Sequence, residues 1–166
     1  DLGMPDAGTD ADGGSSGLYD DCAATSECTL TSTSCCGVCG QPSAADVAAV
    51  HMDERGRYFD EVACPGDPPP CPDCPSALNP ALFATCDMTG FRPACAVVDL
   101  ETPEYASCET NAECVLAKPQ CCACGEVPAH ETIAVRNDAD VNSVICDVGM
   151  GECPPCVPVF DPRAEA

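Results

Sequence analysis

Apolar and polar residues alternate over only a few short stretches of this chain. Cys28 and Leu30 alternate with polar residues from Glu27 to Thr33, which predicts a short strand. A similar stretch from Glu113 to Lys118 predicts a second strand. Between these two stretches, the segment from Leu82 to Leu100 is typical of a β-hairpin whose turn is Asp87-Met88-Thr89-Gly90.

Two longer segments favour helices. Ser43-Ala44-Ala45-Asp46 matches a capping box with Asp in place of Glu, and it predicts a helix from about Ser43 to Ala63 that ends at Cys64-Pro65. A second helix is predicted over roughly Ala129 to Cys146, with a segment three residues shorter, which is close to one helical turn. The apolar positions are Val47, Val50, Tyr58 and Val62 in the first helix, and Ile133, Val135, Val141, Val144 and Ile145 in the second.

The 18 cysteines form a tandem pattern. One set reads C-x5-C-x6-C-C-x2-C, then 24 residues, then C-x6-C-x2-C; the other reads C-x5-C-x6-C-C-x-C, then 21 residues, then C-x6-C-x2-C. Such agreement of spacings predicts two copies of one eight-cysteine unit. The first set is Cys22, Cys28, Cys35, Cys36, Cys39, Cys64, Cys71 and Cys74, and the second is Cys108, Cys114, Cys121, Cys122, Cys124, Cys146, Cys153 and Cys156.

All 18 cysteines are interpreted as structural disulfides. Eight cysteines in each set and two more between the sets permit nine bridges, but eight cysteines allow 105 pairings, so the connectivity stays open. Each member of the adjacent pairs Cys35-Cys36 and Cys121-Cys122 is expected to reach a different partner, because a bond between neighbours needs a strained ring. The remaining two, Cys86 and Cys95, flank the hairpin turn and are candidates to staple its strands.

Composition and charge narrow the class of protein. Leu, Ile, Val and Phe supply 27 residues, about 16%, and the formal net charge is −22. This combination borders on disorder and makes disulfides the main source of stability. A cytosolic α/β enzyme is excluded, nucleic-acid binding is disfavoured by only six basic residues, and no apolar run is long enough to span a membrane.

The start of the chain is an acidic segment. Residues 1–21 contain six Asp and five Gly, which is typical of a flexible tether. Because the chain begins with Asp1 instead of Met, we expect that a targeting peptide has been removed. Together with the disulfides, this predicts an exported protein that is extracellular or on the cell surface, with a lipid anchor upstream of the tether as one option.

Two cysteine motifs admit other chemistry. Cys71-Pro72-Asp73-Cys74 and Cys153-Pro154-Pro155-Cys156 have the C-x-x-C spacing of thiol–disulfide exchange, but they lie in proline-rich loops without a nearby base. With the adjacent cysteines, the same motifs also permit zinc or copper(I) binding through thiolates. We favour structural disulfides at both motifs and predict no metal site and no cofactor.

The remaining polar residues suggest no catalytic centre. His51 aligns with Arg136 in the repeat and His130 has no histidine counterpart near Ala45, so neither histidine looks like a repeated ligand. No Ser–His–Asp arrangement is readable, and the 28 acidic residues are expected to be solvated. The sequence therefore predicts no catalytic residues and no enzymatic activity.

From Asp21 onward the chain resembles an uncharacterised cysteine-rich tandem module of predicted exported bacterial proteins and lipoproteins. The resemblance is carried by Glu27-Cys28, Cys35-Cys36, Ile133-Ala134-Val135, the two C-P-x-C loops and the segment from Cys95 to Leu100. It implies export behind an Asp/Gly tether and no established activity. A final hairpin with its cysteine pair is missing after Pro158, and whether the C-terminus is native stays open.

The expected fold is a small disulfide-rich α+β protein. It has two homologous eight-cysteine modules, each with a short strand, a turn and one helix, joined by a β-hairpin. The expected division is a tether at 1–21, module 1 at 22–80, the linking hairpin at 81–101 and module 2 at 102–166.

The first functional hypothesis is a non-enzymatic extracellular structural or assembly protein. It would form a homo-oligomer or polymer, including a surface fibre in which the N-terminal tail contacts a neighbouring subunit. The alternatives are a metal-binding protein that uses cysteine thiolates and a secreted binding or inhibitor module. The contact loops of such a module would be Pro65–Pro75 and Asp147–Pro158.

Overall fold

The computed structural model describes residues 19–147 and 155–163, and the regular elements in these ranges are short. The strands are β1 (Cys28–Ser32), β2 (Val47–His51), β3 (Leu82–Asp87), β4 (Ala94–Asp99), β5 (Cys114–Ala117), β6 (Gly125–Val127), β7 (Ile133–Arg136) and β8 (Pro158–Phe160). The helices are α1 (Arg55–Tyr58), α2 (Pro103–Ala106) and α3 (Val141–Ile145), and single 3-10 turns precede several strands. The molecule is a small, disulfide-rich α+β protein, as the sequence predicts.

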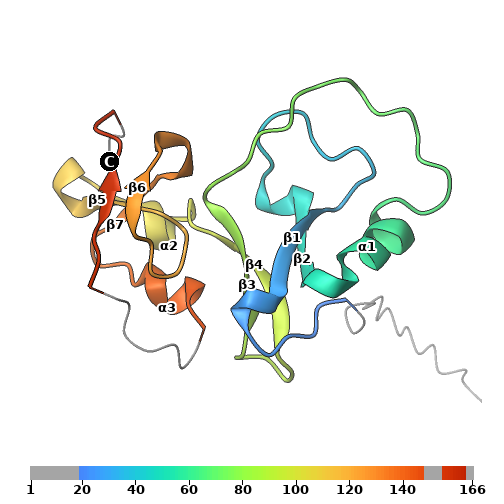
Figure 1. Cartoon of the computed structure of the whole chain (residues 1–166), viewed down its shortest axis with the longest axis horizontal. Helices are drawn as coiled ribbons and strands as arrows, with labels where there is room; N and C mark the ends of the chain where they lie inside the picture. Colours follow the sequence, from blue (N-terminus) through green and yellow to red (C-terminus); the bar gives the residue numbers. More distant parts are fainter. Residues whose placement is uncertain (1–18, 148–154, 164–166) are drawn as a thin grey trace, which may run out of the picture.

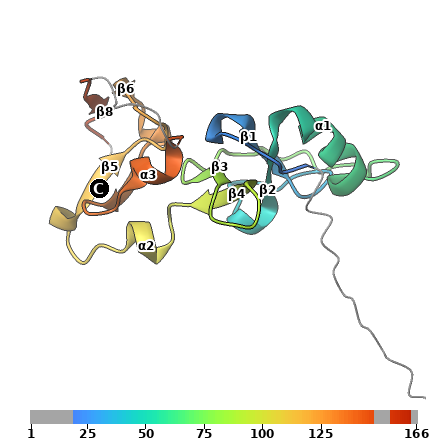
Figure 2. The ribbon, with the colours of Figure 1, turned by 90° about the horizontal axis from the view of Figure 1, so that it is seen from below.

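The described strands form four two-stranded sheets. The pairs β1–β2, β3–β4 and β5–β7 are antiparallel, and β6–β8 is parallel. Strands β1 to β4 and α1 lie on one side of the molecule, and β5 to β8, α2 and α3 lie on the other (Figure 1). The same division is visible from below, with the β3–β4 hairpin next to the second half (Figure 2).

The predicted helix over residues 43–63 is wrong in its first half. The capping box of Ser43 and Asp46 is present, but it caps only the 3-10 turn Ala44–Asp46. The chain then becomes β2, because residues 47–51 find a pairing partner in β1, with Cys28 opposite His51 and Ser32 opposite Val47. After β2, helical structure appears in the 3-10 turn Met52–Glu54, in α1 and in the π-helical turn Phe59–Ala63. Long-range pairing has overridden the local helical pattern.

The second predicted helix, over residues 129–146, fails at the equivalent place. Ile133–Arg136 forms β7 and pairs with β5, so that Cys114 lies opposite Arg136. Helical structure remains only in the 3-10 turn Ala129–Glu131 and in α3, whose N-cap Asp140 accepts a hydrogen bond from the Ser143 N–H. Both errors have one cause: a strand partner lies far away in the sequence and cannot be seen from local spacing.

The predicted hairpin is confirmed as β3–β4, but its expected internal staple is wrong. Cys86 and Cys95 lie directly opposite each other in the strand register. Each is nevertheless bonded to the segment before or at β1, as Cys22–Cys86 and Cys28–Cys95. The reason is that the hairpin packs on the β1–β2 sheet, and Asp21 forms a β-bridge with Ala94, which places the first two cysteines beside the hairpin.

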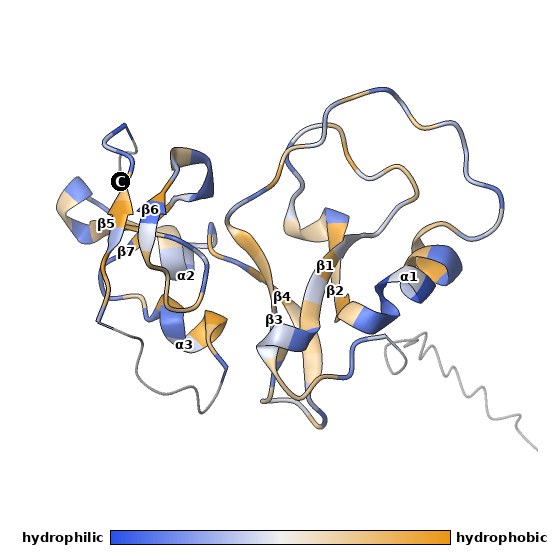
Figure 3. Ribbon diagram, viewed as in Figure 1, coloured by the Kyte–Doolittle hydropathy of each residue, from blue (hydrophilic) through white to orange (hydrophobic). Residues whose placement is uncertain are grey.

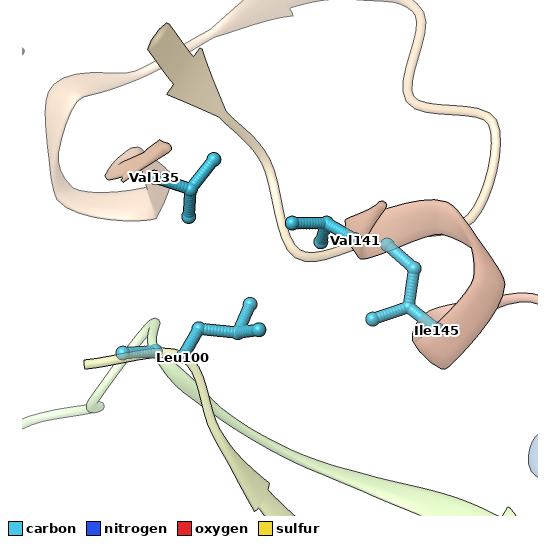
Figure 4. Packing of buried hydrophobic residues seen from close by; sticks show 5 residues of the cluster. Leu100, Val135, Val141 and Ile145 are labelled. Atoms are coloured by element: carbon cyan, nitrogen blue, oxygen red, sulfur yellow. The ribbon is translucent and has the colours of Figure 1, made fainter. Parts of the chain in front are cut away.

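The main apolar cluster joins the two halves. Ala81 and Leu100 from the base of the β3–β4 hairpin pack with Val135, Val141 and Ile145 from the second half. Leu100 and Val135 point toward each other and toward α3 (Figure 4). The exposed fractions of these five residues are 1–8%. A hydrogen bond from the Thr85 hydroxyl to the Val144 carbonyl, 2.9 Å, crosses the same contact.

Eight disulfides are present within the described residues, and none of the described cysteines is free. Cys122 is also disulfide-bonded, and Cys153 lies outside the described residues. As expected, Cys35 and Cys36 reach different partners. The bridges are Cys22–Cys86, Cys28–Cys95, Cys35–Cys64, Cys36–Cys71, Cys39–Cys74, Cys108–Cys114, Cys121–Cys146 and Cys124–Cys156.

Candidate binding groove

An apolar groove lies at the end of the β1–β2 sheet where β1 finishes and β2 begins. Its cavity measures about 420 Å³. Hydrophobic residues are spread thinly over the ribbon, in short stretches separated by hydrophilic ones (Figure 3), so a concave apolar site stands out in this chain. The apolar lining residues are Leu30, Val38, Val47, Leu78 and Leu82, and the polar ones include Ser32, Asp46, Arg55 and Asn79.

The walls of the groove are held by cross-links. The turn after β1 contains Gly37 with φ +64°, a left-handed conformation that favours glycine, and the bridges Cys36–Cys71 and Cys39–Cys74 tie this turn to the following loop. A parallel bridge joins Gly40 to Ser76, and the Asn79 side chain donates to the Pro42 carbonyl at 3.0 Å. Segments without a strand or helix of their own are therefore fixed around the cavity.

Arg55 lines this groove and also a neighbouring hollow of about 400 Å³. All six basic residues of the chain lie within the described ranges, and Arg55 is the one that forms no ion pair there. In a chain of net charge −22, a cation that keeps no acidic partner is available for an outside anion. The paired ones are Arg57 with Glu54 and Glu61, Arg92 with Asp20 and Asp21, Lys118 with Glu131, Arg136 with Asp138, and Arg163 with Asp161.

Asp46 is the acidic group of the groove, and it is already engaged. Its carboxylate accepts hydrogen bonds from the Ser43 hydroxyl at 2.6 Å and from the Ser43 N–H at 2.9 Å. These two bonds hold the pKa of the Asp46 carboxyl below its ordinary value. Asp46 therefore shapes the groove wall and leaves Arg55 to meet an anionic group.

The capping bonds of Asp46 predict a pH dependence. A carboxyl whose pKa is lower in the folded state contributes stability above its unfolded pKa, and that contribution is lost as the pH falls through the folded value. We expect Asp46→Asn to destabilise the protein at about pH 7 and to have a smaller effect at about pH 2, because the contribution of the wild-type carboxyl is progressively lost as the pH falls through its lowered pKa. Urea midpoints at both pH values measure this, with the exposed Asp73→Asn as the control. An equal loss at both pH values would contradict the assignment.

The entry of the N-terminal segment is fixed at the opposite end of the same sheet. The Tyr19 carbonyl accepts a hydrogen bond from the His51 N–H at 2.7 Å. The Tyr19 ring is buried, lies edge-on to Tyr58 with centroids 5.6 Å apart, and has the Arg57 guanidinium 4.7 Å above it. Its hydroxyl donates to Glu61, which raises the pKa of Tyr19. Tyr19 is thus a buried aromatic anchor at the start of the described residues.

The described cysteines of the C-x-x-C motifs and sulfur groups form structural disulfides and provide no free thiols for exchange or metal binding. Cys71 and Cys74 are bonded to Cys36 and Cys39 and not to each other, so this C-x-x-C loop contains no exchange disulfide of its own. Two groups of three cysteines each bring their sulfur atoms within 4.8 Å of one another. The first group is Cys22, Cys28 and Cys95, and the second is Cys121, Cys122 and Cys146. Their sulfurs are in disulfides and are not available as the thiolates that zinc or copper(I) requires.

The two histidines are not brought together with any candidate site. His51 lies in β2, with its Nδ1 accepting from the Asp53 N–H at 3.3 Å and its Nε2 4.0 Å from Glu27. His130 lies in a 3-10 turn, with 77% of its side chain exposed and Glu131 as its charged neighbour. The alignment of His51 with Arg136 is consistent with the strand registers, because His51 stands opposite Cys28 and Arg136 stands opposite Cys114.

The two predicted contact loops differ in how far they can be described. Pro65–Pro75 is an exposed loop without helix or strand, and the disulfides of Cys71 and Cys74 anchor it. It is part of the long loop that arcs above α1 in Figure 1. Most of Asp147–Pro158 lies outside the described residues. The sequence does not predict the groove, because its walls come from segments far apart in the chain. The one signal in the sequence that draws attention to Arg55 is that no Lys or Arg precedes it.

Comparisons with known protein families, characterised proteins and solved structures gave no match to this chain. No helix in the described ranges has the length and apolar character needed to cross a bilayer.

Proposed function

We propose that this chain is a non-enzymatic structural or assembly protein of the extracellular space. Eight disulfides in the described residues are consistent with an oxidising compartment. With its described cysteines cross-linked and its surface strongly acidic, the protein works by binding another macromolecule and not by catalysis. The export suggested by the resemblance to bacterial cysteine-rich modules agrees with this role.

Duplication of one unit is part of the proposal. Cys35–Cys64 and Cys39–Cys74 have counterparts in Cys121–Cys146 and Cys124–Cys156 at the aligned positions. The parallel bridge of Gly40 with Ser76 likewise corresponds to the pairing of Gly125 with Pro158, the first residue pair of β6–β8. Agreement of both disulfides and backbone pairing supports two homologous modules, named here unit one (19–100) and unit two (101–163).

The observation that carries the assembly proposal is the unpaired Arg55 beside an apolar groove. The N-terminal segment of a neighbouring copy has matching chemistry, since residues 1–18 include four Asp, no basic residue, and the apolar Leu2, Met4 and Leu18. An aspartate of this segment would pair with Arg55 while an aliphatic side chain fills the groove. Burying one such side chain would contribute about 1.5–3 kcal/mol.

The positions of groove and tail favour an open chain of subunits. The groove lies at the Ser32–Val47 end of the β1–β2 sheet, and Tyr19 is anchored at the Cys28–His51 end. These ends are about 13 Å apart, from the rise of a five-residue strand. The N-terminal segment is the donor site and the groove is the acceptor site, and they lie on different surfaces. Such sites give head-to-tail contacts, which propagate into a filament unless the rotation between subunits closes a ring.

Arg55→Ala is expected to abolish self-association of the full chain, and so is removal of residues 1–17. Because copies of net charge −22 repel one another over long distances, assembly of the wild type should strengthen between about 10 mM and about 150 mM salt, where the Debye length falls from about 30 to about 8 Å. Sedimentation velocity and electron microscopy measure the polymer. Arg163→Ala is the matched control, since it removes the same charge at an exposed site with its own partner, Asp161.

Polymers that persist in either the Arg55→Ala variant or the truncated chain would refute the tail-in-groove contact. Wild-type protein that stays monomeric under all these conditions would refute the assembly role altogether. In that case a soluble partner that competes for the groove would identify the chain as a binding module.

A further inference from the structure

Four cysteines of unit one lie close enough to exchange partners. Cys22–Cys86 and Cys28–Cys95 are two separate disulfides. The sulfurs of Cys22, Cys28 and Cys95 nevertheless lie within 4.8 Å of one another, although Cys22 is bonded to neither of the other two. One sulfur of the first bridge is therefore a near neighbour of both sulfurs of the second, and thiol–disulfide exchange needs such a neighbour.

Unit two contains a different pairing at the aligned positions. Cys108 and Cys114, which align with Cys22 and Cys28, are bonded to each other. In both loops the N–H after the first cysteine donates to the glutamate before the second cysteine, and a single 3-10 turn ends at that glutamate. These hydrogen bonds run from Ala23 to Glu27 and from Glu109 to Glu113. A bond between Cys22 and Cys28 therefore needs no new kind of loop.

The two hairpin cysteines are also placed to bond to each other. Cys86 and Cys95 stand directly opposite in the β3–β4 register. The Cys86 N–H donates to the Thr25 hydroxyl at 3.3 Å, and the Cys95 N–H donates to the Asp20 carbonyl at 2.6 Å. Both amides thus point away from the partner strand, which identifies a non-hydrogen-bonded pair. The Cα atoms of such a pair are about 4.5 Å apart, within the range that a disulfide spans.

We propose that these four cysteines form a thiol-triggered switch with two pairings. The clamped pairing is the one described above, Cys22–Cys86 with Cys28–Cys95. In the open pairing Cys22 is bonded to Cys28, and Cys86 is bonded to Cys95. The open pairing leaves no covalent link between the start of unit one and its hairpin, so the attachment of this segment depends on contacts such as the ion pairs of Arg92.

The exchange is balanced without a net oxidant. Cys86 is only 9% exposed, but it lines a cavity of about 250 Å³ through which a small thiolate, such as that of free cysteine, can approach. The incoming thiolate bonds to Cys86 and releases Cys22 as a thiolate. Cys22 then attacks Cys28 and releases Cys95, and Cys95 displaces the small thiol from Cys86. Two disulfides break, two form, and the starting thiolate is regenerated.

The test uses the full oxidised chain with a limiting amount of free cysteine and no denaturant. After an acid quench, digestion on the carboxyl side of Glu and Asp separates the four cysteines at sites such as Glu27 and Asp87. Fragments joined by Cys22–Cys28 and by Cys86–Cys95 should appear in equal amounts, at a rate proportional to the added thiol. The intact mass should not change, and the other three bridges of unit one should keep their partners.

The separated open form should also unfold at a lower urea concentration than the clamped form. The clamped bridges join residues 64 and 67 positions apart, whereas the open bridges join residues six and nine positions apart. Short loops constrain the unfolded chain less than long loops do, so the open form loses part of the stabilisation. Equal urea midpoints would contradict the release of the clamp.

A variant with three of the four cysteines tests the sulfur contact directly. In Cys86→Ser, the thiol left on Cys22 should attack Cys28, so that alkylation finds Cys95 free in at least about 10% of the molecules. Cys74→Ser is the matched control, because Cys39–Cys74 belongs to neither three-sulfur group among the described residues. Its thiol should stay on Cys39.

Three results would overturn the proposal. They are the absence of open-pairing fragments from the wild-type chain, exchange to a similar extent at all the bridges of unit one, and a Cys86→Ser variant that carries its thiol on Cys22 alone. The wild-type measurement does not require any variant to fold. Because none of these readouts involves self-association, their failure would leave the tail-in-groove contact untouched.

Discussion

Complete reduction of the disulfides is expected to unfold the chain under conditions where the oxidised protein stays folded. Only 27 residues are Leu, Ile, Val or Phe, and the charge of −22 opposes compaction. Each bridge in a small exported domain contributes about 2–5 kcal/mol, whereas the total stability of a domain is about 5–15 kcal/mol. Losing a few bridges is therefore enough to remove the folded state.

Circular dichroism and size-exclusion chromatography before and after reduction measure this effect. Reduced and alkylated protein should elute as an expanded chain and lose its strand signal. Protein treated with the alkylating reagent alone is the control, and it should be unchanged because none of the described cysteines is free. A reduced chain that keeps the native spectrum and radius would show that the apolar clusters suffice.

Leu100→Ala is expected to cause the largest stability loss of any single aliphatic truncation in the described core. Leu100 is 1% exposed and packs between the hairpin base and unit two, so the substitution leaves a cavity at the joint. Leucine-to-alanine changes at such sites cost about 2–5 kcal/mol. Urea unfolding followed by circular dichroism gives the value.

Leu78→Ala is the matched control for this change. It removes the same atoms from a side chain that is 90% exposed on the groove rim, so the free energy of unfolding should change by less than about 0.5 kcal/mol. Equal losses in the two variants would mean that the joint does not form a packed core.

The strands β1 and β5 and the hairpin could be predicted because their signals are local. The strands β2 and β7 could not. Val47–His51 and Ile133–Arg136 carry valine, isoleucine and alanine at spacings that fit a helix as well as a strand, and a partner about 20 residues away decides between them. The capping box at Ser43 was identified correctly, but a cap specifies where a helical turn starts and not how long it continues.

The cysteines show a similar boundary between local and distant information. Adjacent Cys35 and Cys36 bond to different partners because a disulfide between neighbours is sterically strained, and the sequence alone is enough to predict this. The disulfide partners of Cys86 and Cys95 depend on how the hairpin packs on the β1–β2 sheet. Their positions on either side of the turn suggested a bond to each other, whereas they are bonded to Cys22 and Cys28. Arg55 was equally invisible, because its significance arises from the five other basic side chains finding acids nearby.

The arrangement of the bridges also makes the two units separable. Each of the eight described disulfides joins residues within 22–95 or within 108–156. Residues 101–104 between them are exposed. A protease that cuts there would leave two internally cross-linked fragments held by the Leu100 cluster and the hydrogen bonds beside it, such as Thr85–Val144, so the nicked protein should behave as a heterodimer. Its dissociation constant would give the strength of the joint directly.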